Sequence, residues 1–150
     1  MKRFAAWSII AVACGATAFA GTLVVPWYND LGGPVNYSDP PTPSSGTATY
    51  VRLANRSLTA SLDVTINHYD ASNTMVHTNT GTLGPLDSWA WRPTHDEPAQ
   101  VAPDFGGAAP LTAHKMVVTF TGGLDSDMVG NIVVIPATGG RYGMLLDRSE

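Results

Sequence analysis

Apolar and polar residues alternate with a period of two beyond the first 46 residues, and this pattern constrains the fold most. Val51 and Leu53 share one side of the first such segment, and Val64, Ile66 and His68 share one side of the next. Successive side chains of a β-strand point to opposite faces, so this period predicts strands with one buried face. Seven segments are predicted strands from alternation or from short apolar runs: 47–55, 61–70, 74–80, 88–92, 114–121, 131–136 and 141–146.

The connections between these segments define the fold class. No window past residue 30 repeats apolar residues at helical spacing. Short strands joined by turns every eight to twelve residues or so are typical of two packed antiparallel sheets. We therefore predict an all-β fold, an immunoglobulin-like antiparallel β-sandwich of about seven strands, over residues 47–150. A linker rich in proline and glycine, residues 29–46, precedes it.

Residues 1–28 form a hydrophobic N-terminal segment. Lys2 and Arg3 precede an uncharged run over residues 4–28. As a helix this run would rise about 37 Å, enough to cross the roughly 30 Å hydrocarbon layer of a bilayer. The two cations would stay in the cytoplasm and place the remaining chain outside. This predicts a single-pass protein of a bacterial cytoplasmic membrane, with its main domain in the periplasm or outside the cell.

Three fates of this segment stay open. Ala18, Phe19 and Ala20 match the small-x-small cleavage pattern, so a signal peptidase could release a secreted chain after Ala20. Cys14 is a second possibility, as an acceptor for a lipid anchor. The third fate is a retained transmembrane anchor.

We favour the retained anchor. Ala13, Thr17 and Gly21 are small residues at helical spacing, as a helix packed closely against a partner helix requires. Trp27 and Tyr28 would lie at the outer membrane interface, where amphipathic aromatic rings are enriched. These five residues are predicted contacts with the bilayer or with an integral membrane partner.

Charge and cysteine content narrow the function class. The net charge is −4 and charged residues make up 13% of the chain, so no basic patch predicts nucleic-acid binding. The single cysteine, Cys14, lies in the hydrophobic segment, so the outer domain cannot form an internal disulfide. The low fraction of charged residues indicates that a partner covers part of the surface, or that Thr, Ser, Asn and Gly form it.

Two groups of residues are weak candidates for metal ligands. Pairing across the turn at 70–73 would put His68 opposite Met75 and Ile66 opposite His77, so that two imidazoles share one face. Asp125 and Asp127 resemble the start of a calcium loop. The later ligand positions of that loop hold Val129 and Pro136, so an aspartate-rich turn is favoured. We predict no metal and no other cofactor.

No catalytic motif is present in the sequence. It contains no Gly-x-Ser-x-Gly, no His-Glu-x-x-His and no phosphate-binding glycine loop. His95, Asp96 and Glu97 could exchange protons, but adjacent loop residues usually point apart. Trp89 and Trp91 share a strand face and could fill the core, anchor a protein interface or stack on a sugar. We therefore predict that the chain is not an enzyme.

The order of several segments resembles a known kind of module. TLVVPW, TYVRLANRS, LDVTINHYDASN and a Leu-Gly-Pro turn into WAWRP follow one another over residues 21–93. This order is similar to bacterial secreted or periplasmic immunoglobulin-like modules. The resemblance implies a first strand at 23–26, which favours cleavage over the anchor. It also implies adhesion, scaffolding or partner binding, without a particular chemistry.

The loop 93–110 is the predicted contact region of the outer domain. It is long for a connection within a domain, and Val101 and Phe105 have no predicted strand to belong to. We expect a non-catalytic accessory subunit whose outer sandwich stabilises a membrane protein complex, for example a photosynthetic reaction-centre or respiratory complex. The alternative is a free secreted or lipid-anchored module that binds carbohydrate or a cell-surface polymer. A small-molecule ligand is not expected.

Overall fold

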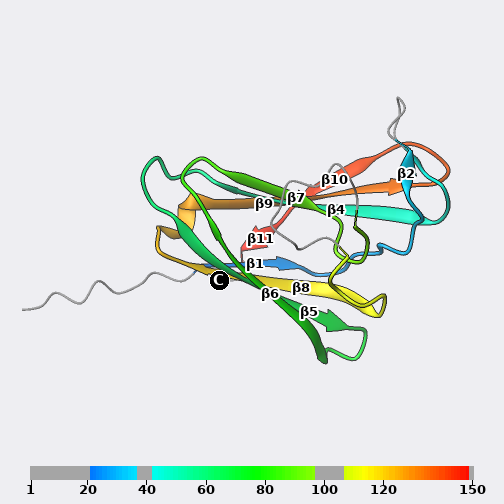
Figure 1. Cartoon of the computed structure of the whole chain (residues 1–150), viewed down its shortest axis with the longest axis horizontal. Helices are drawn as coiled ribbons and strands as arrows, with labels where there is room; N and C mark the ends of the chain where they lie inside the picture. Colours follow the sequence, from blue (N-terminus) through cyan, green and yellow to red (C-terminus); the bar gives the residue numbers. More distant parts are fainter. Residues whose placement is uncertain (1–20, 37–41, 97–106, 149–150) are drawn as a thin grey trace, which may run out of the picture.

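Two antiparallel sheets pack face to face in a computed structural model that describes residues 21–36, 42–96 and 107–148 (Figure 1). The five strands of the first sheet are, in spatial order, β11 (Asp147–Arg148), β1 (Gly21–Val25), β8 (Ala113–Thr121), β5 (Leu62–Asp70) and β6 (Met75–Leu83). The four strands of the second are β10 (Tyr142–Leu145), β9 (Met128–Pro136), β4 (Thr47–Asn55) and β7 (Ser88–Trp91).

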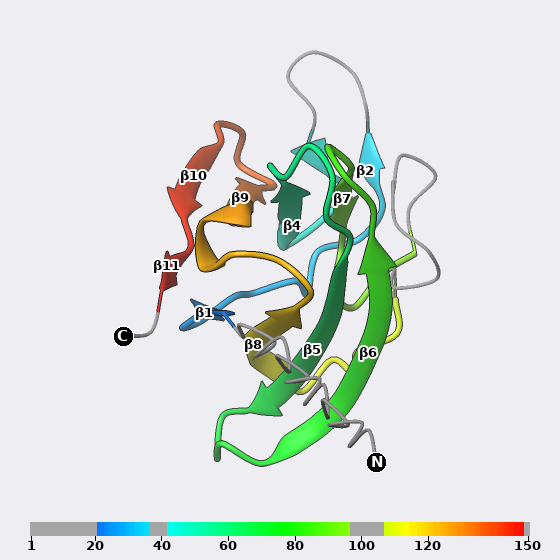
Figure 2. The ribbon, with the colours of Figure 1, turned by 90° about the vertical axis from the view of Figure 1, so that its left-hand side faces the viewer.

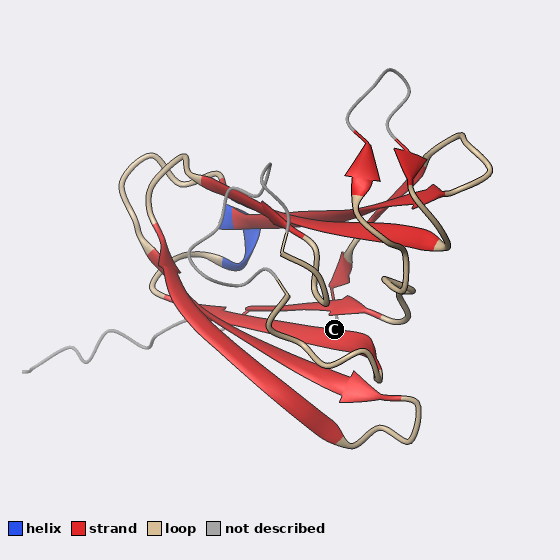
Figure 3. Ribbon diagram, turned by 45° about the vertical axis from the view of Figure 1, so that its right-hand side comes forward, coloured by secondary structure: helices blue, strands red, loops and turns tan. Residues whose placement is uncertain are grey.

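The predicted all-β class is confirmed. The described part of the chain contains only one helical element, the three-residue 3₁₀ turn η1 (Asp125–Asp127), which appears blue in Figure 3. Each of the seven predicted strand segments overlaps an observed strand. The period of two appears in the sequence because residues facing the second sheet are buried and mostly apolar. In β5 these are the apolar Leu62, Val64 and Ile66 and the polar His68.

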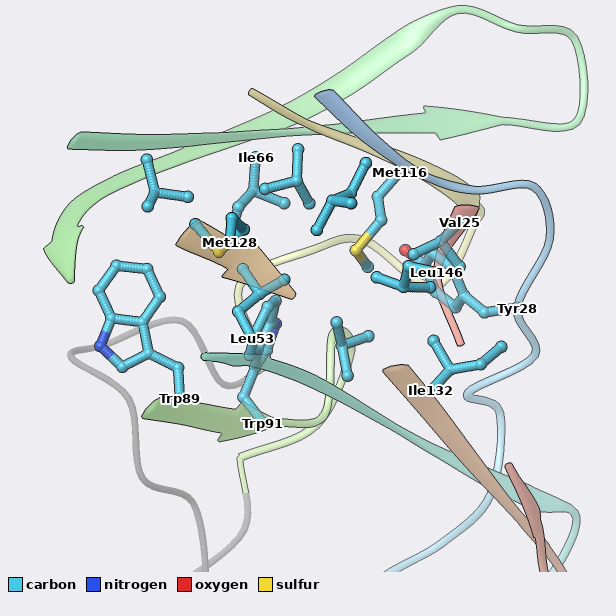
Figure 4. Close-up of a cluster of buried hydrophobic side chains, with 14 of the residues drawn as sticks. Val25, Tyr28, Leu53, Ile66, Trp89, Trp91, Met116, Met128, Ile132 and Leu146 are labelled. Carbon is cyan, nitrogen blue, oxygen red and sulfur yellow. The ribbon is translucent and has the colours of Figure 1, made fainter. Parts of the chain in front are cut away.

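The core lies between the two sheets and is closed by large side chains. Figure 4 shows Trp89 and Trp91 extending from β7 into this space, toward Leu53 and Met128. Trp91 and Met128 are fully buried, and Trp89 is 4% exposed. Full burial of one such aromatic or aliphatic side chain stabilises the fold by roughly 1.5–3 kcal/mol. Of the three roles left open for the two tryptophans, the structure shows the core one.

The helix predicted over the hydrophobic N-terminal segment is not present at residues 21–25. Gly21–Val25 form β1, which pairs with β8 and with β11, so residues 4–28 cannot form one continuous helix. The strand implied at 23–26 by the resemblance is present instead. The error arose because a buried strand and a membrane-spanning helix are both uncharged and apolar. Residues 1–20 lie outside the described residues, and no helix within the described ranges has the length and hydropathy to span a membrane.

The predicted linker also contributes to the folded unit. A small hairpin, β2 (Val35–Asn36) with β3 (Thr42–Pro43), lies within residues 29–46, and β3 contacts β9. Val35 is only 7% exposed. Just before it in the chain, the N–H of Gly32 donates to the carbonyl of Thr47, and the N–H of Gly33 donates to the carbonyl of Ser45. The segment is therefore packed against the four-stranded sheet, and the sandwich includes residues well before the predicted start at residue 47.

One side of the sandwich is formed by the C-terminal part of the chain. β10 is an edge strand of the four-stranded sheet, and β11 is an edge strand of the five-stranded sheet. The two follow one another along the same side (Figure 2). Leu146, which joins them, is buried and donates its N–H to the carbonyl of Gly130.

Candidate functional site

The predicted histidine pair lies on one face, in a register different from the one expected. His68 is directly opposite His77, and the ring centroids are 5.8 Å apart. The register shifts between His68 and Tyr69, where an irregularity adds a residue to one strand. The expectation that Met75 lies opposite His68 was wrong by two positions. The irregularity accounts for one of them. The turn accounts for the other, because it is one residue longer than expected, with the N–H of Asp70 donating to the carbonyl of Thr74.

His68 is held as a neutral imidazole by its two partners. The Tyr28 hydroxyl donates to Nδ1 at 3.1 Å, and Nε2–H donates to Oδ1 of Asn79 at 3.0 Å. Burial lowers the pKa of His68 to about 4; the bond to Asn79 opposes this, and the neighbouring His77 adds a smaller lowering. Both ring nitrogens are thus occupied, so His68 cannot ligate a metal without losing one of these two hydrogen bonds.

The aspartates near η1 stabilise a turn. Oδ2 of Asp127 accepts the backbone N–H of Leu124 at 2.8 Å, and the N–H of Asp127 donates to the Leu124 carbonyl at 2.9 Å. The described ranges contain no group of three His, Cys, Asp or Glu side chains that could hold a metal ion. The hydrogen bonds of Asp127 are those of the aspartate-rich turn that the sequence favoured.

The residues assigned to the membrane helix are placed differently. Gly21 is buried in β1, and Tyr28 is 1% exposed and belongs to the core. Only Trp27, at 60% exposure, stays accessible. The packing face that included Gly21 and the interfacial position of Tyr28 were therefore wrong. Ala13, Cys14, Thr17, Val101 and Phe105 lie outside the described residues.

A buried polar cluster, missed by the sequence analysis, closes one end of the sandwich. Oδ1 of Asp30 accepts Nε–H of Arg92 at 2.8 Å and the backbone N–H of Thr49 at 3.1 Å. Oδ2 of Asp30 accepts the backbone N–H of Thr94 at 3.0 Å. The Arg92 side chain also donates to the carbonyl oxygens of Gly32 and Gly33. The one available signal was a lone arginine inside the apolar stretch WAWRP.

This cluster serves the fold and is closed to ligands. Arg92 is completely buried and Asp30 is 2% exposed. His95 Nδ1 lies 3.8 Å from Oδ2 of Asp30 and is the group of this cluster that reaches toward solvent. Because the charges are paired and hydrogen-bonded, the arrangement pins residues 29–33 to the ends of β4 and β7.

The accessible site is a pocket of about 380 Å³ on the outer face of the four-stranded sheet. Its floor has small residues, Ala54 from β4, Ala90 from β7 and Val129 from β9. Leu145 of β10 forms one wall, and Arg52 is the charged group of the lining. These side chains share the outer face because Val51, Leu53, Trp89 and Trp91, their neighbours along the strands, face the core.

Arg52 occupies the centre of this face. In the register of β4 it lies opposite Ala90 on one side and Asn131 on the other. Among the described side chains, no carboxylate lies within ion-pair distance of its guanidinium. We call the ten residues that line this site the Arg52 pocket: Arg52, Leu53, Ala54, Ser88, Trp89, Ala90, Val129, Gly130, Asn131 and Leu145.

Apolar side chains are exposed on the neighbouring edge strand. Leu145 is 81% exposed, Tyr142 is 63% exposed and Met144 is 48% exposed. Leu146 pairs with Gly130 through a backbone hydrogen bond, so strand alternation turns the amide and carbonyl groups of Gly143 and Leu145 away from β9. Among the described strands, β10 thus lies at the edge of the sheet, and it combines exposed apolar side chains with backbone groups that point away from β9.

Comparisons of the chain with known protein families, with curated proteins and with solved structures find no match.

Proposed function

We propose that the chain is a non-catalytic binding module that holds a partner protein against the outer face of its four-stranded sheet. The Arg52 pocket carries this proposal, because it joins a cation that no described carboxylate neutralises, an apolar floor and the exposed Leu145 on one surface. Exposed apolar residues beside polar groups are characteristic of protein interfaces.

The outer face of the five-stranded sheet gives the contrast. There, polar side chains bond one another across the strands, as Thr78 does with Asn67 at 2.8 Å and Thr82 with Asp63 at 2.9 Å. Polar side chains that hydrogen-bond one another in this way are expected on a surface that stays exposed to water. The two faces therefore differ in chemistry, which favours the four-stranded one as the contact surface.

A protein partner is preferred over carbohydrate. Sugar binding usually involves an exposed aromatic platform, and the two tryptophans considered for that role are buried in the core. An immunoglobulin-like assignment also belongs to this proposal. It is supported by the two-sheet architecture, although β9 leaves the sheet of β8, unlike the last strands of immunoglobulin constant domains.

Export from the cytoplasm is part of the same proposal. The small-x-small pattern ends at Ala20, and β1 comprises Gly21–Val25, so cleavage after Ala20 would leave β1 intact. The partner would then be met outside the cytoplasm, as a membrane protein complex or as a surface protein.

Site-specific photo-crosslinking in the producing cell tests this proposal. A photoreactive residue at Leu145, on edge strand β10, should give a discrete crosslinked protein. The same residue at Thr80, which is exposed on edge strand β6 of the other sheet, should not. Equal products from both positions, or a product from Thr80 alone, would contradict the proposed surface.

A further inference from the structure

The charge distribution over the outer face of the four-stranded sheet indicates which chemical group of the partner protein binds there. Arg52 is exposed at the centre of the face, and the residues facing outward beside it are Ala90 and Asn131. The nearest acidic residue along β7 is Asp87, whose Oδ1 accepts the backbone N–H of Ser88 at 2.8 Å. The face therefore presents one positive charge that no described carboxylate neutralises.

The groups around Arg52 complete a site for a single anionic side chain. A guanidinium is a planar fork that binds a carboxylate through two parallel hydrogen bonds. Ser88 and Asn131 line the same pocket and supply a hydroxyl and an amide group. The floor of Ala54, Ala90 and Val129 offers no polar side chain, so it suits an aliphatic neighbour of the anionic residue.

The pocket size and its single cation limit the ligand. A volume of about 380 Å³ lies near the lower end of the range for small-ligand sites and accommodates one or two side chains. Phosphate recognition typically uses clusters of arginines, whereas one guanidinium matches one carboxylate.

We propose that the Arg52 pocket binds an aspartate or glutamate side chain of the partner protein, flanked by aliphatic residues. This inference rests on the proposed function, since it names the chemistry that the outer face recognises.

Matched peptides test the inference without the natural partner. The full chain in detergent solution is titrated with acetyl-Leu-Glu-Leu-amide and with acetyl-Leu-Gln-Leu-amide, and the amide resonances of Arg52, Ala90 and Asn131 are followed by NMR. The glutamate peptide should bind about three- to tenfold more tightly. This preference should disappear in the Arg52→Gln variant and decrease at high salt, because salt screens exposed charges.

Arg141→Gln is the matched control, since Arg141 is also an exposed arginine next to the four-stranded sheet. This variant should keep the preference for glutamate. Equal binding of the two peptides, no binding of either, or unchanged selectivity in Arg52→Gln would overturn the inference. Crosslinking through Leu145 in the producing cell would still support the proposed surface in any of these cases, so the two failures are distinguishable.

Discussion

The Arg92 guanidinium and the Asp30 carboxylate form an ion pair in which both side chains are closed to solvent, with Nη2 and Oδ1 2.8 Å apart. Asp30 lies after β1 of one sheet, and Arg92 follows β7 of the other. The pair thus joins segments that are far apart in the sequence. Since each charge is desolvated, its stability depends on the presence of the other.

Removing one member of this ion pair should strongly destabilise the fold. Arg92→Met would leave the Asp30 carboxylate buried without its partner, and we expect the free energy of unfolding to fall by about 3–5 kcal/mol. Arg52→Met, at an exposed position, should change it by less than about 0.5 kcal/mol. Urea denaturation of the two variants measures both values. Similar losses would show that the buried pair is not a major support of the fold.

Trp27 and Tyr28 are adjacent in sequence and should respond in opposite ways to truncation. Tyr28→Ala removes a core side chain and the hydroxyl that donates to His68, so we expect a loss of about 3–5 kcal/mol. Trp27→Ala should cost little stability, because Trp27 is 60% exposed. Thermal unfolding of the two variants tests the placement of Tyr28 in the core. A larger loss for Trp27 would be inconsistent with it.

Acid should weaken the fold through His68. The imidazole has its ordinary pKa of 6.5 in the unfolded chain and a pKa of about 4 in the folded protein. Above pH 6.5 both states are neutral. Between these two values mainly the unfolded state takes up a proton, so the free energy of unfolding falls by about 1.4 kcal/mol per pH unit, roughly 3 kcal/mol in total.

The comparison variant for this effect is His68→Gln, which cannot titrate. Subtracting its stability profile from that of the wild type removes the contribution of the carboxylates. The difference in the free energy of unfolding, wild type minus variant, should fall as the pH is lowered from 6.5 to 4 and should be constant from pH 7 to 8. A flat difference across the whole range would mean that His68 does not resist protonation in the fold.

Gly21 should not accept a side chain. A Cβ at this position would overlap the ring of Phe120 and Oδ1 of Asp125, and Phe120 is itself buried. We expect Gly21→Ala to cost about 1–3 kcal/mol. Gly84→Ala is the control, since the nearest atom to an added Cβ there is 3.9 Å away. Equal stability of the two variants in chemical denaturation would show that β1 does not pack closely against β8.

The sequence predicted the strands whose two faces have different environments. In β5 and β8 the period of two in the sequence matches the burial of the side chains, since Ile66 and Val118 face the core while Asn67 and Val117 face outward. β1 was less clear because it continues an uncharged run, and apolar character does not distinguish a strand from a membrane segment. The length of that run therefore led to a helix that included Gly21 and Tyr28.

The candidate site could not be predicted because it depends on strand order. Ala54, Ala90 and Val129 come from three strands that are separated in the sequence and adjacent only in the order β9-β4-β7. No local pattern encodes that order. Similarly, the Asp30–Arg92 pair spans 62 positions and appears only after both sheets are in place.

The most direct measurement of the proposed binding surface compares one added charge on each outer face. Ala54→Glu places a carboxylate in the Arg52 pocket, and Thr65→Glu places one at a similarly half-buried position on β5 of the other sheet. Thermal unfolding first establishes that both variants keep the fold. The yield of the crosslinked complex through Leu145 is then measured in the producing cell. We predict that Ala54→Glu reduces this yield about tenfold or more, because the new carboxylate occupies the pocket and repels the carboxylate of the partner protein. Thr65→Glu should leave the yield unchanged. An unchanged yield with Ala54→Glu, or a loss confined to Thr65→Glu, would contradict the assignment of the four-stranded face as the binding surface.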